Sequence, residues 1–331
     1  MRVAVLYNIP DKNATKVEAE ILAELEVLET VEGVRVALEK LGFEAVPLLC
    51  SVDALLALKR FDVVFNLAEG FENDLHAEPA VVGAFELLGI SYTGSPREAL
   101  ELCRNKHLSK HLLEDEGIPT PRFQLFRKAS DPLKLNFPVI VKPALEDASI
   151  GITSSSVARS RDELEKNVSW ILETYDQPAL VEEYIDGREI NASVILKGDQ
   201  AHVLPLSEII FDLPPEMPRI LGFDSKWQEE SACYKGTMPR CPAELVPELE
   251  QEIKDLAERS CHLLGVRGYA RVDFRLKGDE AFVIEVNPNP CINPKNSGFA
   301  RSASAEGMDY TQLVEKILNT ASVGDSSRSN E

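Results

Sequence analysis

The stretch YARVDFRLKGDEAFVIEVNPNP, residues 269–290, decides how the last third of the chain folds. Its two halves are rich in β-branched and aromatic residues and are separated by the polar segment 277–280, so they predict a β-hairpin. The second half begins as an ordinary buried strand, residues 281–284, and then places a carboxylate and an amide before a Pro-Asn-Pro segment that ends the strand. A purely structural strand has little use for that arrangement.

One face of the predicted hairpin carries four polar side chains. Side chains two apart in a strand share a face, so Arg271 and Asp273 point the same way, and so do Glu285 and Asn287. Folding of the hairpin brings Asp273 roughly opposite Glu285. Two carboxylates and an amide oxygen are hard ligands suited to Mg²⁺, with Mn²⁺ as an alternative. A surface ladder of ion pairs is the other interpretation, although the prolines after Asn287 do not favour it.

Composition limits the classes of function. With 331 residues and 44% hydrophobic content, the chain is expected to form two or three globular domains. The 35 basic and 55 acidic residues give a net charge of -20, which argues against nucleic acid as a partner. The chain lacks both a run of about 18 uncharged apolar residues and a secretory signal, so we expect a cytoplasmic protein without a membrane partner.

Cysteine and histidine spacing gives no sign of zinc or of disulfides. His107 and His111 would share a helix face, but no third ligand is near them in sequence, so we expect solvated helix histidines. The cysteines show no Cys-x-x-Cys pair, which favours free thiols in a reducing compartment. They are at positions 50, 103, 233, 241, 261 and 291.

The order of predicted elements divides the chain into three parts. The first part alternates strands and helices, the pattern of a parallel α/β sheet. Its strands are expected at 2–7, 43–49 and 61–70, and its helices at 16–41, 52–59 and 81–89. The predicted domains are a Rossmann-like domain at 1–96, a central domain at 97–181 and a C-terminal domain with the metal site at 182–321, followed by a disordered tail at 322–331.

The other two parts mix short strands with longer helices. In the central part we expect helices at 98–116 and 161–175 and strands at 123–126, 137–144 and 151–158. In the last part we expect two strands within 179–196, a proline-broken loop at 211–242, a helix at 247–264, the hairpin, and a closing helix at 310–321.

Two lysines suggest a bound nucleotide. Lys142 ends the apolar strand FPVIVKPA, where its charge can reach a phosphate. A lone lysine at a strand end is more often exposed to solvent. However, Lys106 in CRNKHLSK belongs to another segment and the predicted metal hairpin to a third, and together they favour a nucleotide.

Four segments, in this order, resemble the ATP-grasp D-alanine:D-alanine ligases. They are GISYTGSPREALELCRNKHLSKHLLEDEGIPTPRF, FPVIVKPALEDASIG, ALVEEYIDGREI and GYARVDFRLKGDEAFVIEVNPNP. The resemblance covers about residues 60–320 and is specific as an ordered set. It implies a mixed α/β, three-domain ATP-grasp fold with an N-terminal parallel α/β domain, and an ATP- and Mg²⁺-dependent carboxylate–amine ligase.

The resemblance also implies a role for each matching residue. Asp273, Glu285 and Asn287 would ligate the metal, and Arg271 would stabilise the oxyanion of a tetrahedral intermediate. Lys226, in GFDSKW, matches loosely a lysine on the loop that closes over the γ-phosphate. The residues implied to bind ATP are Lys106 and Lys142 for the phosphates, Glu182, Glu183, Tyr184 and Ile185 for the adenine, and Glu189 for the ribose.

The implied reaction has two stages. A carboxylate attacks the γ-phosphate to give an acyl phosphate, and an amine then displaces phosphate from the acyl carbon. Charge neutralisation and alignment do most of the work in phosphoryl transfer. An acyl phosphate must also be kept from water, which would suit a lid formed by the loop 211–242.

The departures from the family cluster on the substrate side. LYNIPDKN replaces the Gly-Gly opening, Ala148 stands where the family usually has a serine, and Cys291 where it has a glycine. We do not expect Cys291 to be a nucleophile, since no histidine is near it in sequence. The candidate substrate contacts are Glu69, His76 and Glu78, which could instead be solvated loop residues, and Asn296 and Ser297 beyond the metal strand.

Three functions therefore stay open. The leading hypothesis is a ligase that acts on small-molecule substrates, an amino acid or a small peptide. The second is D-alanyl-D-alanine synthesis for the cell wall. The third is a nucleotide-binding scaffold without catalysis, which an oxyanion arginine beside a metal site does not favour. A homodimer also stays open.

Overall fold

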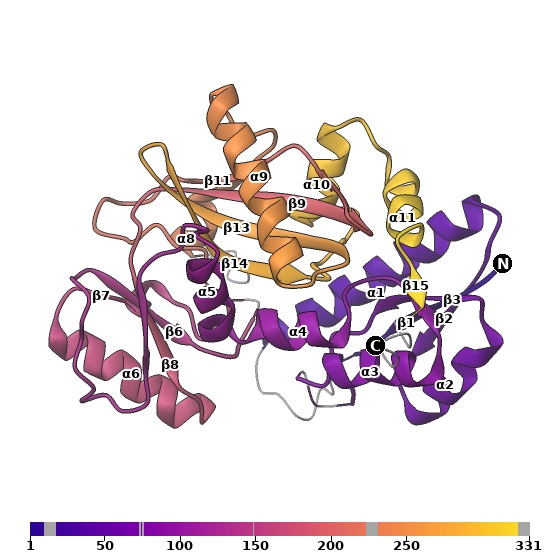
Figure 1. The fold of residues 1–331 in the computed structure, drawn as a ribbon, viewed down its shortest axis with the longest axis horizontal. Helices are drawn as coiled ribbons and strands as arrows, with labels where there is room; N and C mark the ends of the chain where they lie inside the picture. Colours follow the sequence, from indigo (N-terminus) through magenta and orange to yellow (C-terminus); the bar gives the residue numbers. More distant parts are fainter. Residues whose placement is uncertain (10–17, 73, 75, 148, 223–230, 324–331) are drawn as a thin grey trace.

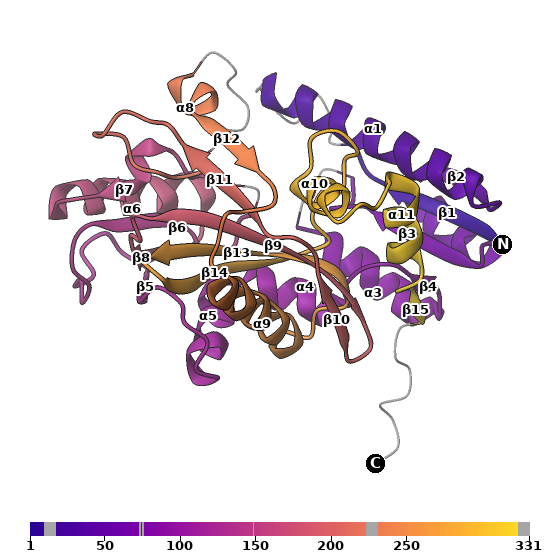
Figure 2. The same cartoon turned by 90° about the horizontal axis from the view of Figure 1, so that it is seen from above.

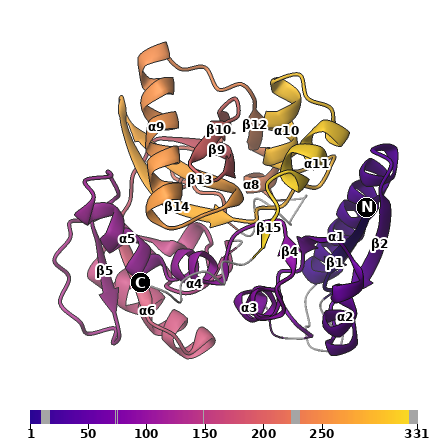
Figure 3. The ribbon, with the colours of Figure 1, turned by 45° about the vertical axis from the view of Figure 1, so that its right-hand side comes forward.

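The computed structural model describes most of the chain and places three β-sheets in that part (Figure 1). The described residues are 1–9, 18–72, 74, 76–147, 149–222 and 231–323. The mixed α/β class predicted from the sequence is confirmed. Figure 3 shows strands β1 and β2 of the N-terminal sheet, in indigo, apart from strands β9, β13 and β14 of the third sheet, in rose to orange.

The N-terminal sheet is parallel along its first four strands, as predicted. Strand β1 pairs with both β2 and β3, and β3 pairs with β4. The apolar residues of β1 are fully buried because helices cover both faces of the sheet. Its elements are β1 (Arg2–Tyr7), α1 (Glu18–Lys40), β2 (Glu44–Leu49), α2 (Val52–Ala57), β3 (Val63–Leu67), α3 (Glu78–Leu88) and β4 (Ser91–Tyr92).

The predicted disordered tail begins too early. Ser322–Val323 forms β15, which pairs antiparallel with β4 and completes this sheet. A free edge strand offers unpaired backbone groups, and the returning chain satisfies them here. The rest of the predicted tail, 324–331, lies outside the described residues.

The central sheet has the strand order β5-β8-β6-β7 and is antiparallel. The predicted single helix at 98–116 is wrong, because Asn105 leaves the helical conformation and its side chain accepts a bond from the Leu108 N–H at 3.1 Å as an N-cap. The elements are α4 (Arg97–Arg104), α5 (Lys106–Asp115), β5 (Phe123–Phe126), β6 (Val139–Pro143), β7 (Val157–Ala158), α6 (Arg161–Tyr175) and β8 (Ala179–Glu183).

Only the end of the predicted strand 151–158 is extended. Residues Ser154–Ser156 form a 3₁₀ turn, in which the side chains of Thr153 and Ser156 each bond the backbone of the other. Hydroxyl side chains compete with strand pairing in this way. The strand β7 is therefore limited to two residues.

The third sheet has the order β12-β11-β9-β13-β14, with β10 on β9. The hairpin is confirmed, including Asp273 opposite Glu285, with an irregularity between Asp273 and Phe274. The predicted loop at 211–242 is wrong at 237–240, which forms strand β12. This strand pairs antiparallel with β11, because the pairing gives its backbone N–H and C=O groups hydrogen-bond partners. The elements are β9 (Arg188–Lys197), β10 (Gln200–Val203), β11 (Ser207–Phe211), α8 (Ala232–Lys235), β12 (Thr237–Arg240), α9 (Pro247–Leu263), β13 (Gly268–Lys277), β14 (Glu280–Pro288), α10 (Gly298–Ala305) and α11 (Tyr310–Leu318).

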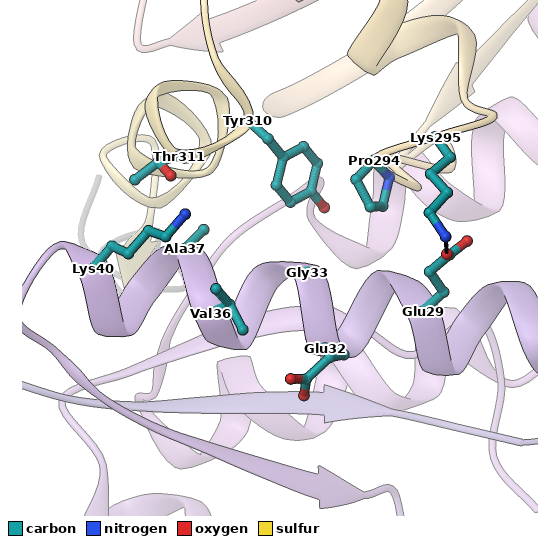
Figure 4. A pocket seen from close by; sticks show the side chains of 10 residues that line it. All are labelled: Glu29, Glu32, Gly33, Val36, Ala37, Lys40, Pro294, Lys295, Tyr310 and Thr311. Atoms are coloured by element: carbon teal, nitrogen blue, oxygen red, sulfur yellow. Dashed lines mark ion pairs between the residues drawn. The ribbon is translucent and has the colours of Figure 1, made fainter.

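The C-terminal helices join the third sheet to the first. Figure 2 shows α11 beside α1, and a cavity of about 340 Å³ lies between them (Figure 4). Gly33 of α1 faces Pro294 and Tyr310 there, where a Cβ would be 3.1 and 3.2 Å from their nearest atoms. None of the residues that line this cavity is predicted to bind ATP or metal, so the cavity is not the candidate site. Among the described helices, none combines the length and the apolar character that crossing a bilayer requires.

Candidate active site

The hairpin β13–β14 gathers its four predicted polar residues into one bonded cluster. Arg271 donates two hydrogen bonds to Asp273, at 2.7 and 2.8 Å. The Asn287 amide lies 3.0 Å from Asp273 and 3.3 Å from Glu285. The strand register creates the cluster, since Arg271 is opposite Asn287 and Asp273 is opposite Glu285. The carboxylates thus face each other across the two strands.

A fifth member of the cluster, Asn191, escaped the sequence analysis. It lies on β9 beside Asp273 and donates to that carboxylate at 2.7 Å. The signal was available in the segment REINAS, where Glu189, Asn191 and Ser193 alternate with apolar residues and so share one face. This alternation is the same kind of pattern that predicts the polar face of the hairpin, and it predicts Asn191 on the polar face of β9.

Lys106 connects the central part of the chain to the hairpin. It begins α5 and is only 4% exposed. Its ammonium group lies 3.0 Å from Asp147, 3.4 Å from Glu285 and 2.5 Å from the carbonyl of Glu146. The start of α5 is close to both strands, because the Lys106 N–H donates to the Ala144 carbonyl just after β6 at 3.1 Å and α5 contacts β14. The structure therefore places the first lysine predicted to bind phosphate beside β14, the strand that carries Glu285 and Asn287.

Lys142 occupies the same region from β6. Its ammonium group is 2.9 Å from Glu182 Oε1 on β8, and both side chains are nearly fully buried. In the register of the sheet, Lys142 is opposite Leu180 and Ile140 is opposite Glu182, so the two charged residues lie diagonally across the strands. A buried ion pair of this kind needs good geometry to offset desolvation.

The electrostatics of the cluster keep Glu285 ionised. Burial alone would raise the pKa of Glu285, but Lys106, Lys142 and Arg271 outweigh it and lower that pKa to about 2. Burial likewise opposes charge on Lys106, yet Glu285 and Asp147 raise its pKa above the usual range. The site therefore holds several fixed charges of both signs at neutral pH.

The segment after Glu182 offers backbone groups beside the lysines. The N–H groups of Glu183 and Tyr184 donate to the carbonyls of Arg122 and Pro138. The N–H of Ile185 has no partner in the part of the chain that the structure describes. Of the three backbone donors predicted to face the adenine, Ile185 is thus the one that a base could use.

Glu189 lies further along β9 and is held by an arginine. Its Oε2 is 2.7 Å from Arg275, whose guanidinium also donates to the Gly187 carbonyl at 3.1 Å. Arg275 stacks on the ring of Phe211, 5.3 Å from its centroid. The orientation of Glu189 is therefore fixed by an arginine that the sequence analysis did not single out.

Two carboxylates of the N-terminal part lie near the end of β14. The Asn289 amide donates to Glu78 at 2.8 Å, and burial, opposed by that bond, raises the pKa of Glu78 to about 8. Glu69 reaches solvent but is surrounded by protein on most sides, and this desolvation, with Asp147 nearby, raises its pKa. His76 instead faces Glu146 at 3.5 Å and is exposed.

The two candidates beyond the metal strand differ. Ser297 caps α10 by accepting from the Ala300 N–H at 3.1 Å, and its hydroxyl donates to the Asn293 carbonyl at 2.7 Å. Because Ser297 is buried and fully used, the structure gives it a capping role. Asn296 is exposed and lies beside the Glu26 carboxylate.

Other predicted features have different outcomes. Cys291 is an exposed residue, but the protein packed around its sulfur removes water from the thiol and raises its pKa to about 11, which disfavours the thiolate that a nucleophile needs. Lys226, Ala148 and residues 10–13, the second half of the segment that replaces the Gly-Gly opening, lie outside the described residues.

The donor set suits a hard divalent cation. Asp273 and Glu285 supply carboxylate oxygens and Asn287 an amide on one face, which matches the preference of Mg²⁺. Within the described residues no group of three or more His, Cys, Asp or Glu side chains has a metal-binding arrangement, so the amide would have to complete the set. A softer metal such as zinc finds neither histidine nor thiolate here.

Comparison with known proteins gives a single result. Residues 112–319 match the family model described as D-ala D-ala ligase C-terminus. A D-alanine--D-alanine ligase of Cupriavidus necator is 33% identical over 311 residues, covering 91% of this chain and 89% of that protein. One of Carboxydothermus hydrogenoformans is 32% identical over 303 residues, with 88% and 92% covered. A protein of Sinorhizobium fredii named Uncharacterized protein y4sG is 34% identical over 304 residues, with 88% and 86% covered.

Solved structures agree. The crystal structure of a D-alanine--D-alanine ligase from Bacillus anthracis complexed with ATP matches with a TM-score of 0.75 at 26% identity, covering 97% of this chain and 96% of that one. A second structure of that enzyme gives 0.77 at 27% identity, with 97% of each chain covered. The fold is thus that of an ATP-grasp enzyme. The chain belongs to the D-alanine--D-alanine ligase family, and its reaction class is ATP-dependent ligation of a carboxylate to an amine.

Proposed function

We propose that this protein joins the carboxylate of an amino acid or small peptide to an amine, with ATP and Mg²⁺, through an acyl phosphate. One observation carries the proposal: Lys106 of α5 meets Glu285 of the metal strand at 3.4 Å, so a phosphate-binding cation and a metal-binding carboxylate share one site. A scaffold without catalysis has no need for Arg271 beside that site. ADP and phosphate are the expected by-products.

The nucleotide would lie between the central and third sheets. Lys106 and Lys142 would neutralise the phosphates, and Glu189, oriented by Arg275, would accept bonds from the ribose hydroxyls. The Ile185 N–H and the Glu182 carboxylate would bind the adenine edge. These roles follow the family resemblance, and the buried positions of the two lysines support them.

Asp273, Glu285 and Asn287 would hold Mg²⁺. Bound there, the metal would neutralise charge on the transferred phosphoryl group. Arg271 is tied to Asp273 by two bonds, and Asp273 more than offsets the effect of burial and raises the pKa of the guanidinium, so Arg271 is a permanent cation. A permanent cation can stabilise an oxyanion without any change of protonation.

The reaction would proceed in two balanced steps. A substrate carboxylate oxygen forms a bond to the γ-phosphorus of ATP while the bridging P–O bond breaks, and ADP leaves. The nitrogen of an amine then bonds to the acyl carbon, the C–O bond to phosphate breaks, and the amine loses a proton. Arg271 would stabilise the negative oxygen that develops between addition and loss of phosphate.

The substrate side of the site favours an amine that carries positive charge. Glu26, Glu69 and Glu78 all have raised pKa values, first because the surrounding protein removes water from their carboxylates. Nearby carboxylates add to this: Glu29 acts on Glu26, and Asp147 acts on both Glu69 and Glu78. An ammonium group would relieve this repulsion. Asn296, beside Glu26, stays a candidate contact for a substrate carboxylate.

D-alanyl-D-alanine synthesis is the second candidate, because relatives of 32–33% identity carry that name. We propose that D-alanine is a poor substrate, since the departures from the family fall on substrate-facing segments while the ATP and metal residues are retained. A site built for another partner can discriminate by about 10⁴. Substrate choice is thus the feature in which this chain differs from those relatives.

The experiment is a phosphate-release screen. Purified protein with Mg²⁺ and ATP is incubated with D-alanine alone and with pairs of amino acids or dipeptides, and ATP alone gives the background. We expect D-alanine to remain near background and another pair to exceed it clearly. Efficient formation of D-alanyl-D-alanine at millimolar substrate would favour the second candidate. No release with any pair would favour a scaffold.

We also propose three domains, at 1–96, 97–181 and 182–321. Strand β8 of the central sheet extends to Glu183, two residues past the second boundary. The six free thiols support a reducing compartment, the cytoplasm. A homodimer is the proposed assembly, and light scattering of the purified protein tests it.

A further inference from the structure

Lys110 is a buried cation that none of the roles above uses. It lies on α5, four residues after Lys106, so both lysines project from the same face of that helix. Its side chain is only 1% exposed. Lysine is rarely buried unless it is paired, so its partners should explain why it is there.

The partners of Lys110 come from three segments. Its ammonium group donates to the Thr120 hydroxyl at 2.7 Å and lies 3.3 Å from Glu182 Oε1. The Thr120 hydroxyl in turn donates to the Val283 carbonyl on β14 at 2.8 Å. The ring of Phe123 lies 5.9 Å from the Lys110 nitrogen. Lys110 is therefore held in place independently of Glu182.

Glu182 Oε1 is shared by two ammonium groups. Lys142 lies 2.9 Å and Lys110 3.3 Å from this one oxygen, and all three side chains are buried. Three ionised groups of this kind carry a net charge of +1. One lysine would be enough to balance Glu182, so the second has another purpose.

The proposed role of Lys142 in phosphate binding explains why Glu182 has a second lysine beside it. If Lys142 turns toward the phosphates of ATP, Glu182 loses its nearest partner. A buried carboxylate without a cation is strongly disfavoured and takes up a proton. Lys110 is fixed by Thr120 and would remain beside Glu182 when Lys142 leaves.

We propose that Lys110 is a positioning residue: it keeps Glu182 ionised when Lys142 binds the ATP phosphates, and so preserves an acceptor for the amino group of adenine. The inference rests on the proposed nucleotide site. It also concerns selectivity, because an ionised carboxylate only accepts hydrogen bonds. It therefore favours the amino group of adenine over the carbonyl oxygen of guanine.

The protonation state of Lys110 is consistent with this role. Burial lowers the pKa of Lys110 to about 8, while Glu182 opposes that effect, and Lys142 adds to it. Lys110 is thus mostly protonated at neutral pH. Glu285 is a further charge that acts on it.

The test measures binding of ATP and GTP, each with Mg²⁺, by calorimetry. Lys110→Met should weaken ATP binding about tenfold or more, because Glu182 would take up a proton and the amino group of adenine would lose a charged acceptor. GTP binding should change much less. The ratio of the two affinities therefore falls. Lys134→Met removes an exposed lysine of the same part of the chain and should leave both affinities unchanged. An unchanged ratio in Lys110→Met would overturn the inference.

A double-mutant cycle separates this role from a general structural one. In Glu182→Gln there is no carboxylate to keep ionised, so adding Lys110→Met should change ATP affinity less than about twofold. The same loss in both backgrounds would overturn the inference.

Lys110→Arg keeps the charge and should keep most of the ATP preference, and Lys110→Gln replaces Lys110→Met if the latter does not fold. Failure of the unmodified protein to bind ATP would overturn the proposed function and this inference together, whereas normal binding with an unchanged ratio would overturn the inference alone.

Discussion

Individual charges in the site are held by specific partners rather than by overall composition. The net charge of -20 would repel a nucleotide, yet Lys106, Lys142 and Arg271 come from three different elements and all act on Glu285. Each is paired with a carboxylate in the structure. The local field at the site is therefore set by these pairs, and single substitutions there should have large effects.

Glu285 gives the first prediction. Glu285→Gln removes a charge with almost no change of shape, so phosphate release should fall on the order of 10²-fold or more while the fold is kept. Steady-state phosphate release, with circular dichroism as the check on folding, measures this. Near-normal Mg²⁺-dependent ATP consumption by the variant would show that Glu285 is not a metal ligand.

Glu78 gives a prediction on pH. Its pKa is raised from 4.5 to about 8 in the folded protein, chiefly by burial, so the folded state binds its proton more tightly than the unfolded state. The resulting stabilisation is fully present below the unfolded value and is lost as the pH rises through about 8. Glu78→Gln cannot titrate, so the stability of the unmodified protein relative to the variant should decline with pH across this window.

Urea unfolding of both proteins at several pH values measures that difference. Gln at this position can still accept the bond from Asn289, so the variant should fold. Glu98→Gln, at an exposed helix position, is the matched control for the chemical change. A difference that does not vary with pH would mean that Glu78 does not keep its proton.

At the scale of elements, short connections place the binding groups. The break at Asn105 starts α5 so that Lys106 is its first residue, and the Lys106 N–H bonds the Ala144 carbonyl at 3.1 Å. The turn before β9 places Ile185 and Glu189 on either side of Gly187. The positions of Lys106, Ile185 and Glu189 therefore depend on these connections.

Gly187 gives a prediction at this scale. A Cβ there would overlap the carbonyl oxygen of Leu276 on β13, so the backbone would have to move. Gly187→Ala should therefore destabilise the fold by about 2–3 kcal/mol and weaken ATP binding as well. Gly198→Ala is a useful contrast, because that residue has φ +59 with nothing within 4 Å, and it should cost only about 1–2 kcal/mol and leave ATP binding unchanged. Equal effects of the two variants would contradict the steric argument.

In the molecule as a whole, all three parts of the chain contribute candidate groups to the proposed site. The central sheet carries Lys142 and Glu182, the third sheet carries the hairpin, and the N-terminal part carries the candidates Glu69 and Glu78. A ligand that contacts more than one part should stabilise the entire fold, because it binds the folded state alone.

Thermal unfolding tests this. ATP with Mg²⁺ at about 100 times its dissociation constant should add about 2.7 kcal/mol to the free energy of unfolding and raise the melting temperature. Adenosine with Mg²⁺ should give a much smaller shift, since it lacks the phosphates that Lys106 and Lys142 would bind. Equal shifts with ATP and adenosine would mean that the lysines do not contact phosphate.

Local periodicity in the sequence is enough to predict the features that depend on neighbouring residues. The alternation of the hairpin placed Arg271, Asp273, Glu285 and Asn287 on one face, because strand geometry is fixed over a few residues. The parallel N-terminal sheet followed from the alternation of strands and helices for the same reason. Resemblance over most of the chain then supplied the reaction class.

Contacts between residues far apart in the sequence are seen only in the folded chain. Nothing local to Lys110 indicates that it shares an oxygen of Glu182 with Lys142, and nothing in the spacing of Arg275 indicates that it holds Glu189. Likewise, the capping role of Ser297 and the pairing of β15 with β4 depend on which backbone groups remain unsatisfied after folding. Ion pairs and caps of this kind depend on packing between elements far apart in sequence, which periodicity does not encode.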